Sequence, residues 1–181
     1  MSDPRPLTGE PLCLDLLNTY WIGENGPEDL LDSTDGVSVW LHSAGLADRA
    51  VANEATRDAL RETREVLRAL VDGEAGRDAA RELNRILERG ALRYRLGAAG
   101  PETCGTTDDP AWLPAWLAAT DYLGLVDGKP ERIKRCAAHP KCVLHFYDTT
   151  KNGTRRWCSM AGCGNRAKAA RHYERERAGS G

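Results

Sequence analysis

Apolar residues in the first two thirds of the chain recur mainly at helical spacing, and they predict five helices. These helices span about residues 10–22, 34–44, 54–72, 77–89 and 112–125. Asn53 and Gly73 are expected to cap the two ends of the third helix. The second and third helices have the clearest apolar stripes, formed by Val37, Trp40, Leu41 and Ala44 and by Leu60, Thr63, Leu67 and Leu70.

The polar positions of these helices predict which faces meet water. The outer face of the third helix alternates in charge and is expected to be solvated; it carries Arg57, Asp58, Arg61, Glu62, Arg64 and Glu65. In the fourth helix, Ala80, Leu83 and Leu87 are expected to point inward, and Gly90 to form a left-handed C-cap. Residues 23–27 and 97–110 have the composition of loops.

Two stretches alternate with period two instead and predict strands. Residues 91–96 place Leu92, Tyr94 and Leu96 on one face and two arginines on the other. Residues 143–147 also read as a strand, and Asn152-Gly153 favours a tight hairpin turn with residues 154–157 as the returning strand. A basic helix is predicted after Cys163.

Charge divides the chain into two parts. The net charge is −2, but residues 129–181 hold 13 Lys and Arg against 4 Asp and Glu, a net of +9. Residues 1–128 hold 12 Lys and Arg against 23 Asp and Glu, a net of −11. We therefore place a domain boundary near residue 128. A basic end of this kind suits nucleic acid, and docking onto the chain's own acidic part is the alternative.

Four cysteines in the basic part have the spacing of a zinc site. Cys136 and Cys142 form one close pair, and Cys158 and Cys163 form another, fifteen residues later. They predict one structural Zn²⁺ held by four thiolates. His139 or His145 could replace one cysteine. Two disulfides are disfavoured, because the N-terminus has no signal-peptide pattern and a cytoplasmic location is expected.

The fold class that follows is α+β. We expect a mainly helical N-terminal domain, residues 1–128, with a small β element, followed by a small zinc finger of treble-clef-like or ribbon type, residues 129–181. No apolar run is long enough for a membrane span. The chain also lacks a nucleophile elbow and a phosphate-binding glycine loop, and four thiolates leave zinc no open position, so an enzyme is not expected.

The finger resembles a known family. Cys163-Gly164-Asn165-Arg166, preceded by residues 155–160 (RRWCSM) and by the first cysteine pair, is similar to the CGNR zinc finger of bacterial proteins. Residues 10–19 (EPLCLDLLNT) resemble the start of the ABATE domain that precedes this finger in the family. The resemblance implies a zinc-dependent transcription regulator linked to stress response.

Basic residues around the finger are candidates for nucleic-acid contact, with DNA expected. Lys168, Arg171 and Arg175 share one helical face and would contact phosphates, while Asn165 or Arg155 would approach the bases. The candidate set is completed by Lys151, Arg156 and Arg166. Arg166 has a second interpretation, in which it stabilises the zinc site by a hydrogen bond.

Other functions stay open at this stage. The finger could be a protein-interaction module, or a redox switch in which cysteine oxidation releases zinc. A homodimer is open as well. A small-molecule ligand among Trp21, Trp40, Trp112 and Trp116 has no support, because such residues usually belong to the core.

Overall fold

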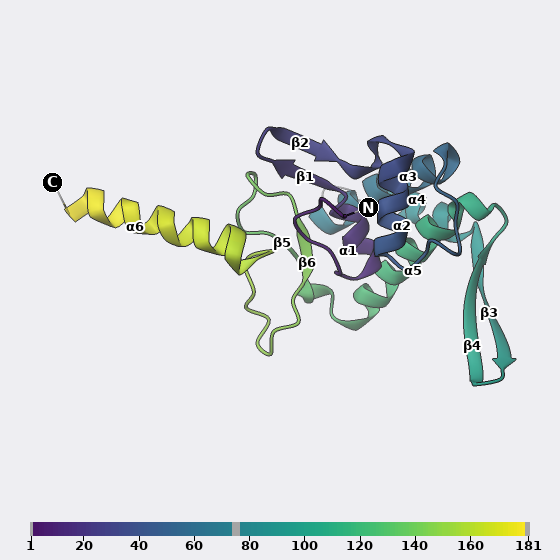
Figure 1. Ribbon diagram of the computed structural model, residues 1–181. Coiled ribbons are helices and arrows are strands. Elements are labelled where there is room, and N and C mark those ends of the chain that lie inside the picture. The colour runs from purple at the N-terminus through teal and green to yellow at the C-terminus, as the bar shows by residue number, and fades with distance from the viewer. Residues whose placement is uncertain (1, 74–76, 180–181) are drawn as a thin grey trace.

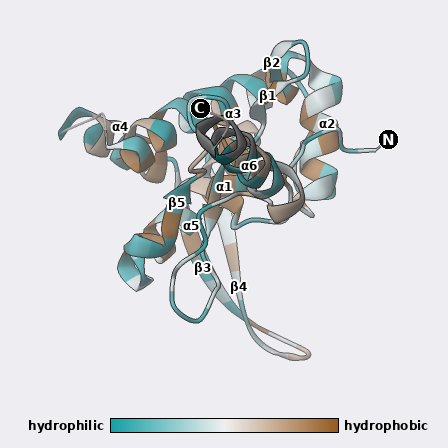
Figure 2. Ribbon diagram, turned by 90° about the vertical axis from the view of Figure 1, so that its left-hand side faces the viewer, coloured by the Kyte–Doolittle hydropathy of each residue, from teal (hydrophilic) through white to brown (hydrophobic). Residues whose placement is uncertain are grey.

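In the computed structural model, residues 2–73 and 77–179 are described, and they form a helical body that carries the finger at one end (Figure 1). The body contains five α-helices: α1 (Leu12–Leu17), α2 (Thr34–Ser43), α3 (Glu54–Asp72), α4 (Arg77–Leu87) and α5 (Leu113–Gly128). Helix α3 packs against α5 and α4, and α5 also packs against α1. Figure 2 shows apolar residues, in brown, interspersed with polar residues, in teal, along these helices. This combination of helices with small antiparallel sheets confirms the predicted α+β class.

Helix α3 follows the sequence prediction closely. The Asn53 side chain accepts a hydrogen bond from the Thr56 N–H, and Gly73 ends the helix in the left-handed conformation with φ 72°. The predicted apolar stripe faces the core, where Leu60 and Leu67 are fully buried.

Arg64 departs from the prediction, which placed it on the solvated face of α3. Its guanidinium is buried and contacts Asp29 through two hydrogen bonds of 2.6 Å, and Thr19 Oγ1 at 2.9 Å. The prediction was wrong because the periodicity of a single helix does not show that the segment ending at Asp29 folds over it. A buried arginine needs such a partner for its charge.

The segment that ends at Asp29 was itself predicted incorrectly. The first helix ends at Leu17, and a hairpin follows in place of the expected helix end and loop: β1 (Tyr20–Gly23) pairs with β2 (Gly26–Asp29). Asn25-Gly26 at its turn, with Gly26 at φ 126°, was an available hairpin signal. A 3₁₀ turn, Leu30–Asp32, then leads to α2, where Ser33 is the N-cap.

The region after α4 also contains more strand than expected. Ala79, Leu83 and Ile86 are the buried residues of α4, whereas Ala80 is exposed. Gly90 begins β3 (Gly90–Gly97) and is not left-handed, and residues predicted as loop form β4 (Gly100–Thr107). Strand β4 has no apolar alternation of its own, so its pairing with β3 decides its conformation. A 3₁₀ turn, Pro110–Trp112, leads into α5, whose first turn contains Pro114 as predicted.

The finger contains one short antiparallel strand pair and the last helix. After a 3₁₀ turn at Pro130–Arg132, β5 (Ile133–Arg135) pairs with β6 (His145–Tyr147), and residues 154–157 do not form the predicted returning strand. Hydrogen bonds hold this segment instead. Lys134 Nζ donates to the Gly153 and Arg155 carbonyls, and Asp148 accepts from the Arg155 N–H. Gly153 does adopt a left-handed conformation, φ 63°. One π-helical turn, Met160–Gly164, precedes α6 (Asn165–Gly179).

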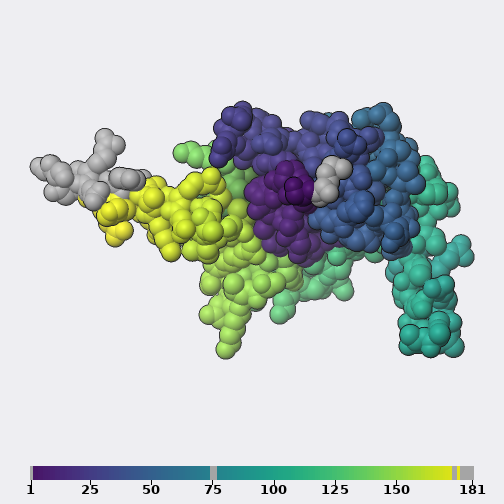
Figure 3. Space-filling view, in the orientation of Figure 1, coloured from purple at the N-terminus to yellow at the C-terminus, as the bar shows by residue number. Residues whose placement is uncertain are grey.

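Helix α6 and the β3–β4 hairpin project from opposite ends of the molecule (Figures 1 and 3). Residues of the finger nevertheless share one apolar core with the body: Cys136, Leu144 and Phe146 belong to the same buried cluster as Leu14, Trp40 and Leu60. Within the described residues, no helix is long and apolar enough to cross a membrane.

Candidate metal centre and basic finger

The four predicted cysteines meet at one point. Cys136 follows β5, Cys142 precedes β6, and Cys158 and Cys163 come from the loop and π-helical turn before α6. Their Sγ atoms lie within 4.8 Å of one another, and all four side chains are buried. Cys158 Sγ is 3.7 Å from both Cys142 Sγ and Cys163 Sγ. Zn–S bonds of about 2.3 Å in a tetrahedron require S–S separations of about 3.8 Å, so these residues fit one zinc ion.

The two alternative ligand sets do not agree with this geometry. All six cysteines are free thiols, and 3.7 Å is far longer than a disulfide bond of about 2.05 Å. His145 is buried, but its Nε2 atom lies 2.9 Å from an Asp72 carboxylate oxygen, away from the sulfur cluster. His139 is exposed and is not part of the cluster either.

Hydrogen bonds within the cluster favour a thiolate at Cys142. A hydrogen bond from Cys158 lowers the pKa of Cys142 to about 5, and the same contact raises the pKa of Cys158. Arg166 donates from Nη2 to Cys163 Sγ at 3.0 Å, and this contact raises the pKa of the guanidinium. The second interpretation of Arg166, a hydrogen bond that stabilises the zinc site, therefore agrees with its position.

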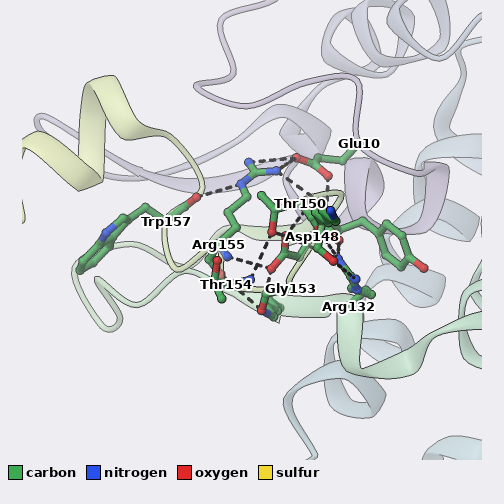
Figure 4. A network of polar contacts seen from close by, with 11 residues as sticks. Glu10, Arg132, Asp148, Thr150, Gly153, Thr154, Arg155 and Trp157 are labelled. Carbon is green, nitrogen blue, oxygen red and sulfur yellow. Dashed lines mark hydrogen bonds and ion pairs between the residues drawn. The ribbon is translucent and has the colours of Figure 1, made fainter.

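A polar network supports the loop between the cysteine pairs (Figure 4). Asp148 is buried and accepts from Lys134 Nζ at 2.7 Å, from Thr150 Oγ1 at 2.6 Å and from the Arg155 N–H at 2.9 Å. Burial opposes its ionisation, but these hydrogen bonds hold the pKa of Asp148 below its usual range. Arg132 donates to the backbone carbonyls of Asp148, Thr150 and Lys151.

Arg155 is held inside this framework. Its guanidinium lies over the Phe146 ring, 4.1 Å from the ring centroid, and donates to the Cys158 carbonyl at 2.6 Å. It also reaches Glu10 of the body at 3.3 Å (Figure 4). Glu10 additionally accepts from the Tyr147 N–H at 2.9 Å. The arginine thus ties the second cysteine pair to β6 and to the start of the body.

Asn18 makes the central contact between body and finger. Its side chain donates to the His145 carbonyl and accepts from the His145 N–H, both at 2.9 Å. Asp72 adds contacts to the His145 ring and, at 3.6 Å, to Arg135. Sequence reasoning did not single out Glu10, Asp72 or Asp148. Only Asp148 had a local signal, as an aspartate followed two residues later by the hydrogen-bonding Thr150.

The remaining basic candidates lie on the surface. The exposed residues are Lys151, Arg156, Asn165, Arg166, Lys168, Arg171 and Arg175. Arg156 lies over the Trp157 ring, 5.3 Å from its centroid. On α6, Arg171 donates to the Ala167 carbonyl and Arg175 to the Arg171 carbonyl, each one turn earlier on the same helix. The finger therefore docks on the body through Arg135 and Arg155, and α6 keeps its cations toward solvent.

A cavity of about 530 Å³ separates the metal centre from the N-terminal part of the body. Its lining includes Trp21 and Glu28 from the body and Lys141 and Arg166 from the finger. Three of the four cysteines, Cys142, Cys158 and Cys163, also line it.

The geometry and the chemistry of this centre define a four-cysteine zinc-finger protein that binds one structural zinc ion. Residues 132–176 match the family described as CGNR zinc finger. Residues 10–129 match ABATE, whose description is "Putative stress-induced transcription regulator". The chain belongs to the ABATE family, joined here to a CGNR finger. No protein among those with curated descriptions matches it.

Proposed function

We propose that this protein is a zinc-dependent transcription regulator that binds DNA through its finger. The observation that carries the proposal is the position of α6. This basic helix begins two residues after the metal ligand Cys163 and projects away from the acidic body (Figure 1). A helix held at one end and exposed along its length is suited to lie in a major groove.

The charges of α6 support phosphate contact. Lys168, Arg171 and Arg175 are exposed and are spaced three and four residues apart, so they share one face. Each such cation can displace a condensed counterion from DNA. Lys151, Arg156 and Asn165 extend the exposed surface toward the metal centre, with Asn165 in reach of a base edge at the start of the helix.

We assign different tasks to the two parts of the chain. Residues 1–128 form the regulatory and interaction domain, and residues 129–181 the nucleic-acid-binding finger, in a cytoplasmic, non-enzymatic protein. The internal contacts of Arg155 favour a positioning role for it over base contact. The CGNR and ABATE matches support a regulator over an enzyme.

The salt dependence of binding tests the proposal. We expect zinc-loaded protein to bind fluorescent duplex DNA with an affinity that falls steeply with salt. Changing Lys168, Arg171 and Arg175 together to Ala should reduce the slope of log K against log salt by about 2.7, since each phosphate contact contributes about 0.9.

A matched triple variant on α4, with Arg77, Arg81 and Arg85 changed to Ala, is the control, because these arginines are also exposed on one helix. It should leave the slope unchanged. An equal slope for the α6 variant and the wild type would reject phosphate contact by α6. Preference for single-stranded RNA in the same titration would reject DNA as the target.

The cavity beside the metal centre favours a second candidate, a thiol switch. It gives a small oxidant such as hydrogen peroxide a route to Cys142, Cys158 and Cys163. Two thiolates would be oxidised to a disulfide while the peroxide is reduced to water, and zinc would be released. Zinc release at low peroxide, reversed by a thiol, would support this candidate, and retention of zinc under millimolar peroxide would exclude it.

A further inference from the structure

The β3–β4 hairpin, residues 90–107, is here called the arm. It extends from the body into solvent at the end opposite α6 (Figures 1 and 3). A hairpin of only two strands is marginally stable at best in water. The arm nevertheless keeps a continuous register over eight residue pairs, from Gly90 opposite Thr107 to Gly97 opposite Gly100.

The two faces of the arm differ in chemistry. The register places Leu92, Tyr94 and Leu96 on the same face as Pro101 and Thr103, and this face has no charged side chain. Tyr94 is 79% exposed and Leu96 is 83% exposed. The other face carries Arg93, Arg95 and Glu102. A strand whose apolar residues alternate so strictly normally covers an apolar surface with them.

The base of the arm is fixed on α5. A Cβ atom at Gly90 or at Gly105 would come within 2.7 Å of the Trp116 ring, so both glycines permit close packing there. Trp116 in turn donates its indole N–H to the Leu87 carbonyl at 2.9 Å. The apolar face therefore starts in contact with α5 and continues beyond the body without cover from the described residues.

Helix α5 also presents an uncovered apolar surface. Asp121 is its only charged residue before Asp127, and it faces inward, where it accepts from the Cys13 N–H at 3.0 Å. Leu123, two turns after Trp116, is 43% exposed, and Val126 is 39% exposed. A helix that is apolar around its whole circumference is usually buried on all sides.

We propose that the arm of one chain packs on α5 of a second copy, in a two-fold symmetric dimer. Both halves of the contact are present on the same chain, which is the condition for an isologous interface. The two surfaces also suit each other, because the same face of the arm already packs on α5 of its own chain at Gly90 and Gly105, and the charged residues of the arm lie on its other face. Because α6 projects from the opposite end, both fingers would stay accessible.

Sedimentation of the zinc-loaded full chain, without nucleic acid, tests the dimer. We expect dimerisation in the micromolar range. Leu96→Asp, and separately Val126→Arg, should each weaken it at least about tenfold, the usual effect of removing a central apolar contact. Both positions are exposed in the single chain, so the variants should keep the far-UV CD spectrum of the wild type, and its melting temperature at concentrations where the chain is monomeric.

Ala91→Asp is the matched control, since it adds the same charge to the same strand on the opposite face. It should leave dimerisation unchanged. A mixture of the Leu96→Asp and Val126→Arg chains gives the sharpest test. In the heterodimer, one arm–helix contact has the wild-type residues Leu96 and Val126, and the other pairs the introduced Asp with the introduced Arg. The heterodimer should therefore form more tightly than the homodimer of either variant.

Three outcomes would overturn the proposal. The first is a wild-type chain that stays monomeric up to about 100 µM, too weak for a specific interface. The second is equal dimerisation of the wild type and both variants, which would place the contact elsewhere. The third is disruption by Val126→Arg with no recovery in the mixture, which would exclude exchange of the arm between copies. None of these outcomes depends on DNA binding.

Discussion

At the scale of single residues, two arginines show how strongly tertiary contacts determine the role of a charge. Arg64 and Arg166 both lie on helices rich in exposed charge. Arg64 is buried against Asp29, and Arg166 reaches the sulfur of Cys163. The Arg64 contact joins residues far apart along the chain, whereas Arg166 contacts a residue three positions earlier, and each contact leads to a prediction.

Removing Arg64 should strongly destabilise the body. Arg64→Ala leaves the Asp29 carboxylate largely buried without its partner, and losing one member of a buried pair costs about 3–5 kcal/mol. The measurement is the free energy of unfolding in urea. The control is Arg61→Ala on the same helix, where the ion pair with Asp32 is exposed and should contribute less than about 1 kcal/mol. A similar loss of unfolding free energy in the two variants would contradict a stabilising role of the buried Arg64–Asp29 pair.

Removing Arg166 should weaken zinc binding. Loss of the N–H donor to Cys163 Sγ removes a stabilising contact to a thiolate ligand, and such changes reduce metal affinity about 10- to 100-fold. Competition with a chromophoric chelator measures the effect. Arg156→Ala, which removes an exposed cation near the same centre without a sulfur contact, should keep the wild-type affinity. If both variants bind zinc like the wild type, the contact has no role in metal binding.

At the scale of elements, the loop between the cysteine pairs depends on one carboxylate. Residues 148–155 have no regular strand, and Asp148 organises them by accepting from Lys134, Thr150 and the Arg155 N–H. This explains how the segment stays ordered without the hairpin pairing that its Asn152-Gly153 turn favours. The carboxylate must be ionised to serve all these donors.

Acid should therefore loosen this loop. The pKa of Asp148 is lower in the folded protein than in the unfolded chain, so its contribution is complete above the usual aspartate pKa of about 4 and declines as the pH falls below it. The protection of residues 148–155 against hydrogen exchange, relative to the intrinsic exchange rate at each pH, should fall in this range. Asp148→Asn should show fast exchange already at neutral pH, whereas exchange that does not differ from the wild type would contradict this role.

At the scale of the whole molecule, the acidic body and the basic finger are joined through specific contacts. Asn18 binds both backbone groups of His145, and Leu144 and Phe146 pack in the core of the body. Charge and composition change near residue 128, but the apolar core continues across that point. Folding of the body and metal binding by the finger should therefore be coupled.

Zinc removal is expected to shift the unfolding of the whole chain. Because the metal binds the folded finger in preference to the unfolded chain, it stabilises every element whose folding depends on the finger. Calorimetry should show one main transition whose midpoint falls on chelation. In Asn18→Ala, which loses both hydrogen bonds to His145, this dependence should decrease. Two separate transitions in the wild type, with only the smaller one sensitive to chelator, would show independent domains.

Much of this architecture could be predicted from the sequence because it depends on local patterns. Helical periodicity located α2, α3, α4 and α5, helix propensity located the basic helix, and the caps of α3 followed from Asn53 and Gly73. Cysteine spacing predicted all four metal ligands, since paired thiolates on short bends are enough to outline a zinc site. The opposite charges of the two halves also follow directly from composition.

Tertiary structure alone decided which partners these elements have. Strands β4 and β5 have no strand signal in their own sequence, so their conformation depends on pairing with β3 and β6. The burial of Arg64, the placement of Arg155 between body and finger, and the bond from Asn18 to His145 all join residues distant along the chain. Local periodicity shows which side of an element is apolar. Only the packing of the whole chain determines what that side contacts and which partners the charges beside it find.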